Sequence, residues 1–182
     1  MKQLLITIAA VVVVGCGESQ QSTTAPVVKP VEPVDEAAHP EPATAKVPDI
    51  PIIYAARDGN IEAVKQNLAA GTEVDYKDIF QKTALHEAAR KGRKEIAELL
   101  ISKGADMNAR DSLTLTPLHY AAVSDHKKIA ELLIAKGANI NEINKYDRTP
   151  LDVAIRQKHT ETVNFLRKHG GKTAEELKAA GN

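Results

Sequence analysis

Two histidines are the side chains of this sequence best suited to bind a metal or to transfer a proton. His86 and His119 lie 33 residues apart, and each ends a Thr-x-Leu-His segment. If the two occupy equivalent helices of stacked units, their rings lie about 8–10 Å apart, which is the distance between packed helices. One zinc ion needs its ligand nitrogens at about 2.1 Å, so this pair cannot share an ion. The equivalent residue of the next segment is Asp152, a further sign against a repeated catalytic design.

Other signatures of catalysis or cofactor binding are missing from the sequence. It has no Gly-x-Ser-x-Gly, His-Glu-x-x-His or Cys-x-x-Cys segment. Gly171-Lys172-Thr173 resembles the end of a phosphate-binding loop, but the earlier glycine that such a loop requires is Leu166. We therefore expect no catalytic residue, no metal and no cofactor. An enzyme or a small-ligand sensor remains an alternative, and it would need a closed pocket with convergent polar groups.

The only cysteine follows a short apolar segment at the start of the chain. Lys2 precedes eleven mostly apolar residues, 4–14. This length is typical of a signal-peptide core and is too short to span a bilayer. The segment leads through Gly15 into Cys16, and Val-Val-Gly-Cys resembles the lipobox of bacterial lipoproteins. The resemblance implies that residues 1–15 are a lipoprotein signal peptide.

The lipobox resemblance also predicts where the chain resides. It implies that Cys16 is lipidated and anchors the mature chain in a membrane, since two or more acyl chains give durable binding. Gly17 follows the cysteine, where an aspartate would argue for retention at the inner membrane. We therefore expect a bacterial cell envelope protein on the periplasmic face of a membrane, with the outer membrane favoured. An ordinary secretory signal with a coincidental cysteine is the alternative.

Residues 16–49 have the composition of a tether. The segment 17–49 holds six prolines, and six acidic residues against two lysines. Prolines interrupt helices and sheets alike, and no apolar periodicity survives in this segment. We expect a Pro-rich disordered tether that holds the folded part away from the membrane.

Residues 50–182 show an internal period of 33 residues. Thr83, Thr116 and Thr149 mark equivalent helix starts. Threonine is a favoured N-cap, and a glycine at a helix end favours a left-handed cap. Such glycines recur at the same spacing after the second apolar segment of each unit: Gly71, Gly104, Gly137 and Gly170. The pattern predicts stacked helix–turn–helix units, each unable to bury its apolar face alone.

Thr-Pro-Leu-His-x-Ala-Ala followed by Leu-Leu-x-x-Lys-Gly-Ala is similar to the signature of the ankyrin repeat. The resemblance covers nearly all of residues 52–173. It implies an all-α ankyrin-repeat solenoid of stacked helix–turn–helix units with β-turn fingers, in which His86 and His119 are structural hydrogen-bonding residues of the turn. The expected units are about 50–77, 78–110, 111–143 and 144–173, followed by a closing helix over 174–182.

Five positions depart from the glycines of the family. The turn glycine before each threonine is replaced by Gln81, Thr114 or Asp147, and the glycine after the first helix is replaced by Asp125 and Lys158. A non-glycine residue held at positive φ costs on the order of 1 kcal/mol. We therefore expect strain or a small rearrangement in these loops.

By the same resemblance, partners dock on the fingers and on the concave face of the first helices. Phe80, Leu113 and Tyr146 recur at the 33-residue spacing and would form an apolar row along the fingers. Together with a partly basic strip on the first helices, this row would suit a partner with an acidic, apolar-patched surface. Alternatively, these three side chains fold back and pack between the fingers. The predicted partner-binding residues are Ile79, Phe80, Lys82, Arg90, Lys91, Leu113, Leu115, Val123, Tyr146, Arg148 and Arg156.

The sequence therefore predicts a non-catalytic protein-binding module, monomeric, with a protein partner still to be identified. A narrower alternative is a periplasmic immunity or inhibitor protein that neutralises a toxic enzyme. Nucleic-acid binding is not expected, because residues 50–182 hold 21 basic against 18 acidic side chains, spread over all units.

Overall fold

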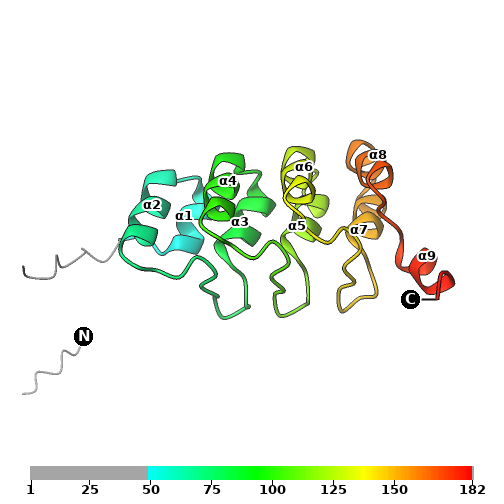
Figure 1. Ribbon diagram of the computed structural model, residues 1–182, viewed down its shortest axis with the longest axis horizontal. Coiled ribbons are helices and arrows are strands. Elements are labelled where there is room, and N and C mark those ends of the chain that lie inside the picture. Colours follow the sequence, from blue (N-terminus) through cyan, green and yellow to red (C-terminus); the bar gives the residue numbers. More distant parts are fainter. Residues whose placement is uncertain (1–48, 182) are drawn as a thin grey trace, which may run out of the picture. The chain divides into compact units, whose positions relative to one another are not determined.

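The computed structural model describes residues 49–181, and these residues form nine helices and no strand (Figure 1). Successive helix pairs stand side by side in chain order, which confirms the expected all-α solenoid. The predicted signal peptide (1–15), Cys16 and the predicted tether up to residue 48 lie outside the described residues. The helices are α1 (Ile52–Asp58), α2 (Ile61–Ala69), α3 (Ala84–Lys91), α4 (Lys94–Ser102), α5 (Pro117–Val123), α6 (Lys127–Ala135), α7 (Pro150–Gln157), α8 (Thr160–Lys168) and α9 (Ala174–Ala179).

Three of the first helices begin at the threonines that the sequence singles out. Thr83, Thr116 and Thr149 are the N-caps of α3, α5 and α7, each in an extended conformation. Pro117 and Pro150 follow at the first helical position, where a missing N–H leaves no hydrogen bond unmade. The predicted helix starts are therefore confirmed.

The core lies between the helices of neighbouring units, and alanine keeps it compact. Because an alanine side chain ends at Cβ, neighbouring first helices approach closely. They are in far more extensive contact than the second helices α2, α4, α6 and α8. The fully buried alanines of the first helices are Ala55, Ala56, Ala84, Ala88, Ala89, Ala121, Ala122 and Ala154.

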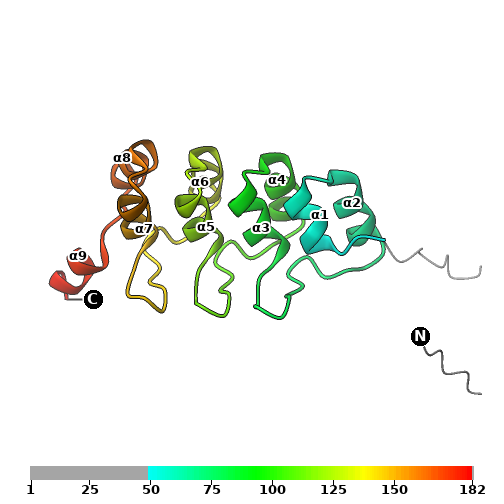
Figure 2. The ribbon, with the colours of Figure 1, turned by 180° about the vertical axis from the view of Figure 1, so that it is seen from behind.

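Loops between the pairs project to one side of the helices as a row of fingers (Figure 2). We define the fingers as residues 78–82, 111–115 and 144–148. A backbone hydrogen bond closes each of them, from the N–H of the first residue to the carbonyl of the fifth, at 3.0–3.1 Å. The fingers are therefore short, closed loops with defined tips.

The five residues that stand in place of family glycines all have positive φ, as expected. In the fingers, φ is 61° at Gln81, 57° at Thr114 and 53° at Asp147. In the turns after α5 and α7, φ is 56° at Asp125 and 63° at Lys158. These loops thus keep the conformation that a glycine would adopt, and the strain of about 1 kcal/mol per residue stays local.

The closing helix is shorter than expected. α9 begins after Thr173, whose N–H donates to the Glu176 carboxylate at 2.7 Å, while the Glu176 N–H donates to the threonine hydroxyl at 3.2 Å. This reciprocal pair of bonds is a capping box. The helix ends at Ala179 instead of continuing to residue 182, because Gly181 takes a left-handed φ of 82°.

Candidate functional site

The two histidines join each unit to the next finger. His86 Nδ1 accepts the backbone N–H of Thr83 at 3.0 Å, and its Nε2 donates to the carbonyl of Leu115 at 3.1 Å. His119 makes the equivalent two bonds one unit later. Both rings are fully buried, and burial lowers their pKa values, that of His119 to about 4. The hydrogen-bonding role is confirmed, and both imidazoles are neutral linkers of the stack.

The last unit replaces this histidine by Asp152, and its partners differ accordingly. The carboxylate accepts the N–H of Thr149 at 3.0 Å and the N–H of Ala174, the first residue of α9, at 2.8 Å. Within residues 49–181, no further finger follows that could receive a ring N–H. An acceptor-only side chain therefore suits the end of the array, where it holds the closing helix instead.

The base of each finger is fixed by a side chain that sequence reasoning missed. Asp78 Oδ1 accepts the N–H groups of Phe80 and Lys82 at 2.8 and 2.9 Å. Asp111 and Asn144 make the same two bonds in the next fingers. The recurrence of Asp or Asn at a spacing of 33 residues, and their known preference for turns, was the signal that could have found them.

Neighbouring fingers are also tied to one another. The backbone N–H of Ser112 donates to the carbonyl of Phe80 at 3.0 Å, and that of Lys145 donates to the carbonyl of Leu113 at 3.1 Å. The three tips are therefore held in line by main-chain bonds.

The apolar side chains at the finger tips remain open to solvent. Ile79 is 89% exposed, Phe80 and Tyr146 are 55% exposed, and Leu113 is 38% exposed. Lys82 and Arg148 cover two of the rings only partly, with the Lys82 ammonium 5.5 Å from the Phe80 ring centre and the Arg148 guanidinium 5.7 Å from that of Tyr146. The row is thus available to a partner.

A polar cluster connects the first finger to α3 and α5. Glu87 is almost fully buried, accepts from Arg90 at 2.6 Å and lies 3.7 Å from the Lys82 ammonium. The same ammonium lies 5.6 Å from the ring centre of Tyr120, another residue that the sequence analysis left out. The Tyr120 hydroxyl donates to Asp111 at 2.8 Å, and burial together with this bond raises its pKa. These contacts join the first finger to α3 and α5, so the finger and these first helices form one continuous face.

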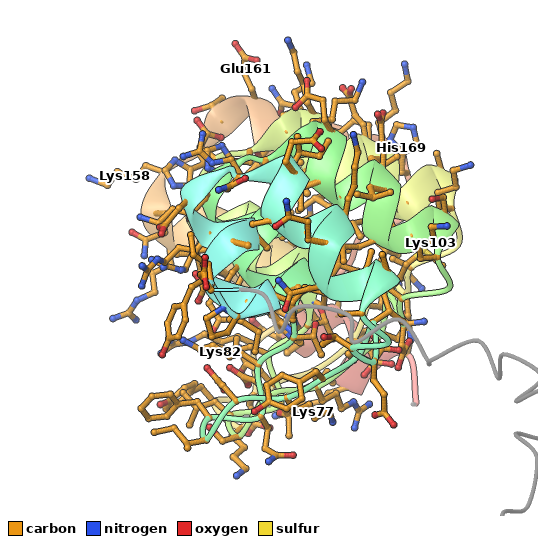
Figure 3. All side chains as sticks on the ribbon, turned by 90° about the vertical axis from the view of Figure 1, so that its left-hand side faces the viewer. Lys77, Lys82, Lys103, Lys158, Glu161 and His169 are labelled. Atoms are coloured by element: carbon orange, nitrogen blue, oxygen red, sulfur yellow. The ribbon has the colours of Figure 1, made fainter. Side chains whose placement is uncertain are left out.

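The remaining predicted residues extend this face. Lys82 lies between the fingers and the helices in the view along the array (Figure 3), and Leu115 and Arg148 are its equivalents in the next two fingers. Val123 and Arg156 occupy the position of Arg90 on α5 and α7, and both are exposed. Lys91, the last residue of α3, is exposed beside Arg90. The predicted residues therefore lie on the fingers and the first helices.

Open grooves lie between neighbouring units along residues 49–181. One lies between α2 and α4, and another lies between Tyr146, Arg156 and Lys178 at the C-terminal end. In the same residues, no three His, Cys, Asp or Glu side chains are grouped so that they could hold a metal ion. No helix among them has the length and apolarity needed to cross a bilayer.

Comparison with known proteins agrees with this geometry. A family model described as ankyrin repeats (3 copies) matches residues 39–111 and 111–176. No curated protein matches the chain significantly.

Proposed function

The chain belongs to the ankyrin-repeat family, whose arrays are protein-binding modules, and on this premise we propose that it is a non-catalytic binding module held in the bacterial cell envelope by a lipid on Cys16. The observation that supports binding most directly is the row of exposed apolar tips. Phe80, Leu113 and Tyr146 come from three separate units, yet main-chain bonds hold them in one line. Exposed apolar groups in a preorganised row favour association, because little conformational freedom is lost when a partner binds.

The anchoring part of the proposal rests on the sequence of the first sixteen residues. A basic residue, an apolar core of eleven residues and Val-Val-Gly-Cys precede a chain with no other cysteine. The single thiol at this position fits lipidation better than a disulfide, since it has no intramolecular partner. The mature chain then faces the periplasm, with the outer membrane favoured by Gly17.

Binding is tested by affinity capture from detergent-solubilised membranes with the full chain as bait. The proposal expects one or a few proteins that the wild type retains and the triple variant Phe80→Ser, Leu113→Ser, Tyr146→Ser loses. The matched control is Tyr76→Ser with Ile155→Ser, which removes two exposed apolar side chains outside the row. Equal capture by the wild type and the triple variant would argue against the row. If the captured protein is an enzyme that the chain inhibits, the narrower inhibitor function applies.

Anchoring is tested separately by mass analysis of the mature N-terminus from membranes. We expect a chain that starts at Cys16 with acyl groups attached, and a Cys16→Ser variant that is neither processed at this site nor lipidated. An unmodified cysteine, or a different mature N-terminus, would contradict the anchor without bearing on partner binding.

A further inference from the structure

On the continuous face formed by the fingers and the first helices, equivalent positions differ in charge from one unit to the next. Lys82, Glu87 and Arg90 lie on one continuous face, joined by the ion pairs of Glu87. Together with Lys91 they give the unit 78–110 a net charge of +2 on this face. We call these four positions and their equivalents the recognition face: 82, 87, 90 and 91; 115, 120, 123 and 124; 148, 153, 156 and 157.

The middle unit contributes no charge to the recognition face. Its residues are Leu115, Tyr120, Val123 and Ser124, and Leu113 at the finger tip continues the apolar strip. Val123 and Leu113 are each 38% exposed. An apolar strip therefore runs along this unit from the finger tip to the end of α5.

The next unit is cationic again. Arg148 and Arg156 give it a net charge of +2 on the recognition face, since the other two residues are Val153 and Gln157. Within the described residues, neither arginine has a carboxylate within salt-bridge distance. Three carboxylates line the groove beside them. Asp152 accepts the two backbone N–H groups of the cap, Asp147 pairs with Lys178 at 3.4 Å, and Glu175 lies beyond salt-bridge distance of both arginines. These two guanidinium groups are available to an external acceptor.

The charge on this face exceeds that of the whole folded part. The recognition face totals +4, whereas residues 50–182 carry 21 basic against 18 acidic side chains, a net charge of +3. Positive charge is therefore concentrated here, but an uncharged strip divides it into two groups. A nucleic acid, with a phosphate at every step, would leave one of its phosphates on that strip, so a polypeptide with separated carboxylates is the better match.

From this pattern, +2, 0 and +2, we propose that the recognition face binds an extended partner segment in which a bulky apolar side chain is flanked on both sides by carboxylates. This proposal rests on the proposed binding function and adds the chemistry of the partner. The apolar side chain lies on Leu115 and Val123, one acidic flank meets Arg148 and Arg156, and the other meets the cations of the first finger and α3. Neighbouring units are about 10 Å apart. At about 3.3 Å per residue, the carboxylates lie about three residues before and after the apolar side chain.

The first experiment is a selection of random 12-residue peptides on the full chain, immobilised through its C-terminus in detergent. We expect enriched peptides with Phe, Leu or Trp at the centre and Asp or Glu about three residues to each side. Enrichment of peptides without acidic flanks would overturn the proposal but leave protein binding standing. A selection that enriches no sequence would overturn the proposal, and if membrane capture also fails, the proposed function falls with it.

The second experiment exchanges the charges. Arg148→Glu with Arg156→Glu should weaken binding of a synthetic peptide with Glu flanks by roughly tenfold, as two exposed charge pairs are lost. A second peptide has lysines in place of the acidic flank that meets Arg148 and Arg156. The same variant should bind this peptide better than the wild type does. Fluorescence anisotropy measures both affinities, and a thermal melt establishes that the variant is folded.

Matched controls make this exchange decisive. Lys128→Glu on α6 with Lys136→Glu at its C-cap changes the net charge equally, outside the recognition face, and should alter affinity less than twofold. Leu115→Ser should weaken peptides of either charge. Equal loss in both charge-reversal variants, or equal competition by a single-stranded oligonucleotide, would show a general charge effect and overturn the proposal.

Discussion

The buried histidines and the exposed finger tips recur with the same period, but they have opposite environments. His86 and His119 are fully buried, whereas Phe80 and Tyr146 are 55% exposed. Each histidine ring donates to a carbonyl of the next finger, while the apolar tip side chains stay exposed and the fingers meet through main-chain bonds and one bond from the Lys145 ammonium to the Ser112 carbonyl. The period identifies equivalent positions, but the packing of the neighbouring unit decides whether a position stabilises the array or faces a partner.

Removing a buried ring should have the largest effect on stability. His119→Ala leaves the N–H of Thr116 without its acceptor, removes one of the two hydrogen bonds to the carbonyl of Arg148 and opens a cavity. We expect a loss of about 3 kcal/mol in the free energy of unfolding, measured by urea denaturation. His169→Ala, which removes an exposed histidine, is the control and should change stability by less than about 0.5 kcal/mol. Similar losses in both variants would remove the distinction between the two environments.

Lowering the pH should reduce the free energy of unfolding by a comparable amount, because the two histidines are buried. Burial lowers the pKa of His119 from 6.5 to about 4 and lowers that of His86 as well, so between these pH values the unfolded chain binds more protons than the folded chain. The stabilising effect of a neutral His119 is therefore complete above pH 6.5, decreases as the pH falls and is lost near pH 4, a change of about 3 kcal/mol. Urea denaturation between pH 7 and pH 5 measures the slope. The slope should be smaller in His119→Ala, and an unchanged slope would show that the ring already titrates normally in the fold.

Removing the Asp152 carboxylate from the last unit should cost less stability than removing a buried histidine from an earlier unit. Asp152→Ala removes the acceptor for the N–H groups of Thr149 and Ala174, and both of these hydrogen bonds are only partly buried. We expect a loss of about 1–2 kcal/mol. Hydrogen exchange should show faster exchange confined to α9 and the start of α7. Asp152→Asn keeps an acceptor oxygen and should retain most of the stability, so equal losses in the two variants would contradict the capping role.

Lys158 has a left-handed backbone conformation and offers a test of backbone strain away from the buried histidines and the finger tips. Lys158 has a φ of 63° after α7, at the position where Gly59 and Gly92 follow α1 and α3. Lys158→Gly should stabilise the chain by about 0.5–1 kcal/mol, because relief of the strain exceeds the added flexibility of the unfolded chain. Thermal melting measures the gain, and a lower melting temperature would mean that the lysine side chain contributes contacts that outweigh the strain.

The sequence allowed most of the stack to be predicted, because threonine caps, alanine pairs and helix-end glycines act locally and recur in each unit. The positive φ values at Gln81 and Asp125 followed from the missing glycines by the same argument. The exposure of Phe80 did not follow, since it depends on where a neighbouring finger places its side chains. The Lys82–Glu87–Arg90 cluster was missed for a similar reason: it joins a loop to a helix face, and no periodicity marks such a contact.

The finger tips should show the smallest effect on stability, and this result would separate the two regions most clearly. Phe80→Ser, Leu113→Ser and Tyr146→Ser together remove exposed surface and two partial cation–ring contacts, each worth about 0.5 kcal/mol in water. The main-chain bonds between fingers do not depend on these side chains, so the three substitutions should lower the free energy of unfolding by no more than about 1 kcal/mol. Urea denaturation beside His119→Ala makes the comparison direct. A loss as large as that of the buried histidine would show that the tips pack between the fingers in solution, because only buried contacts are worth that much.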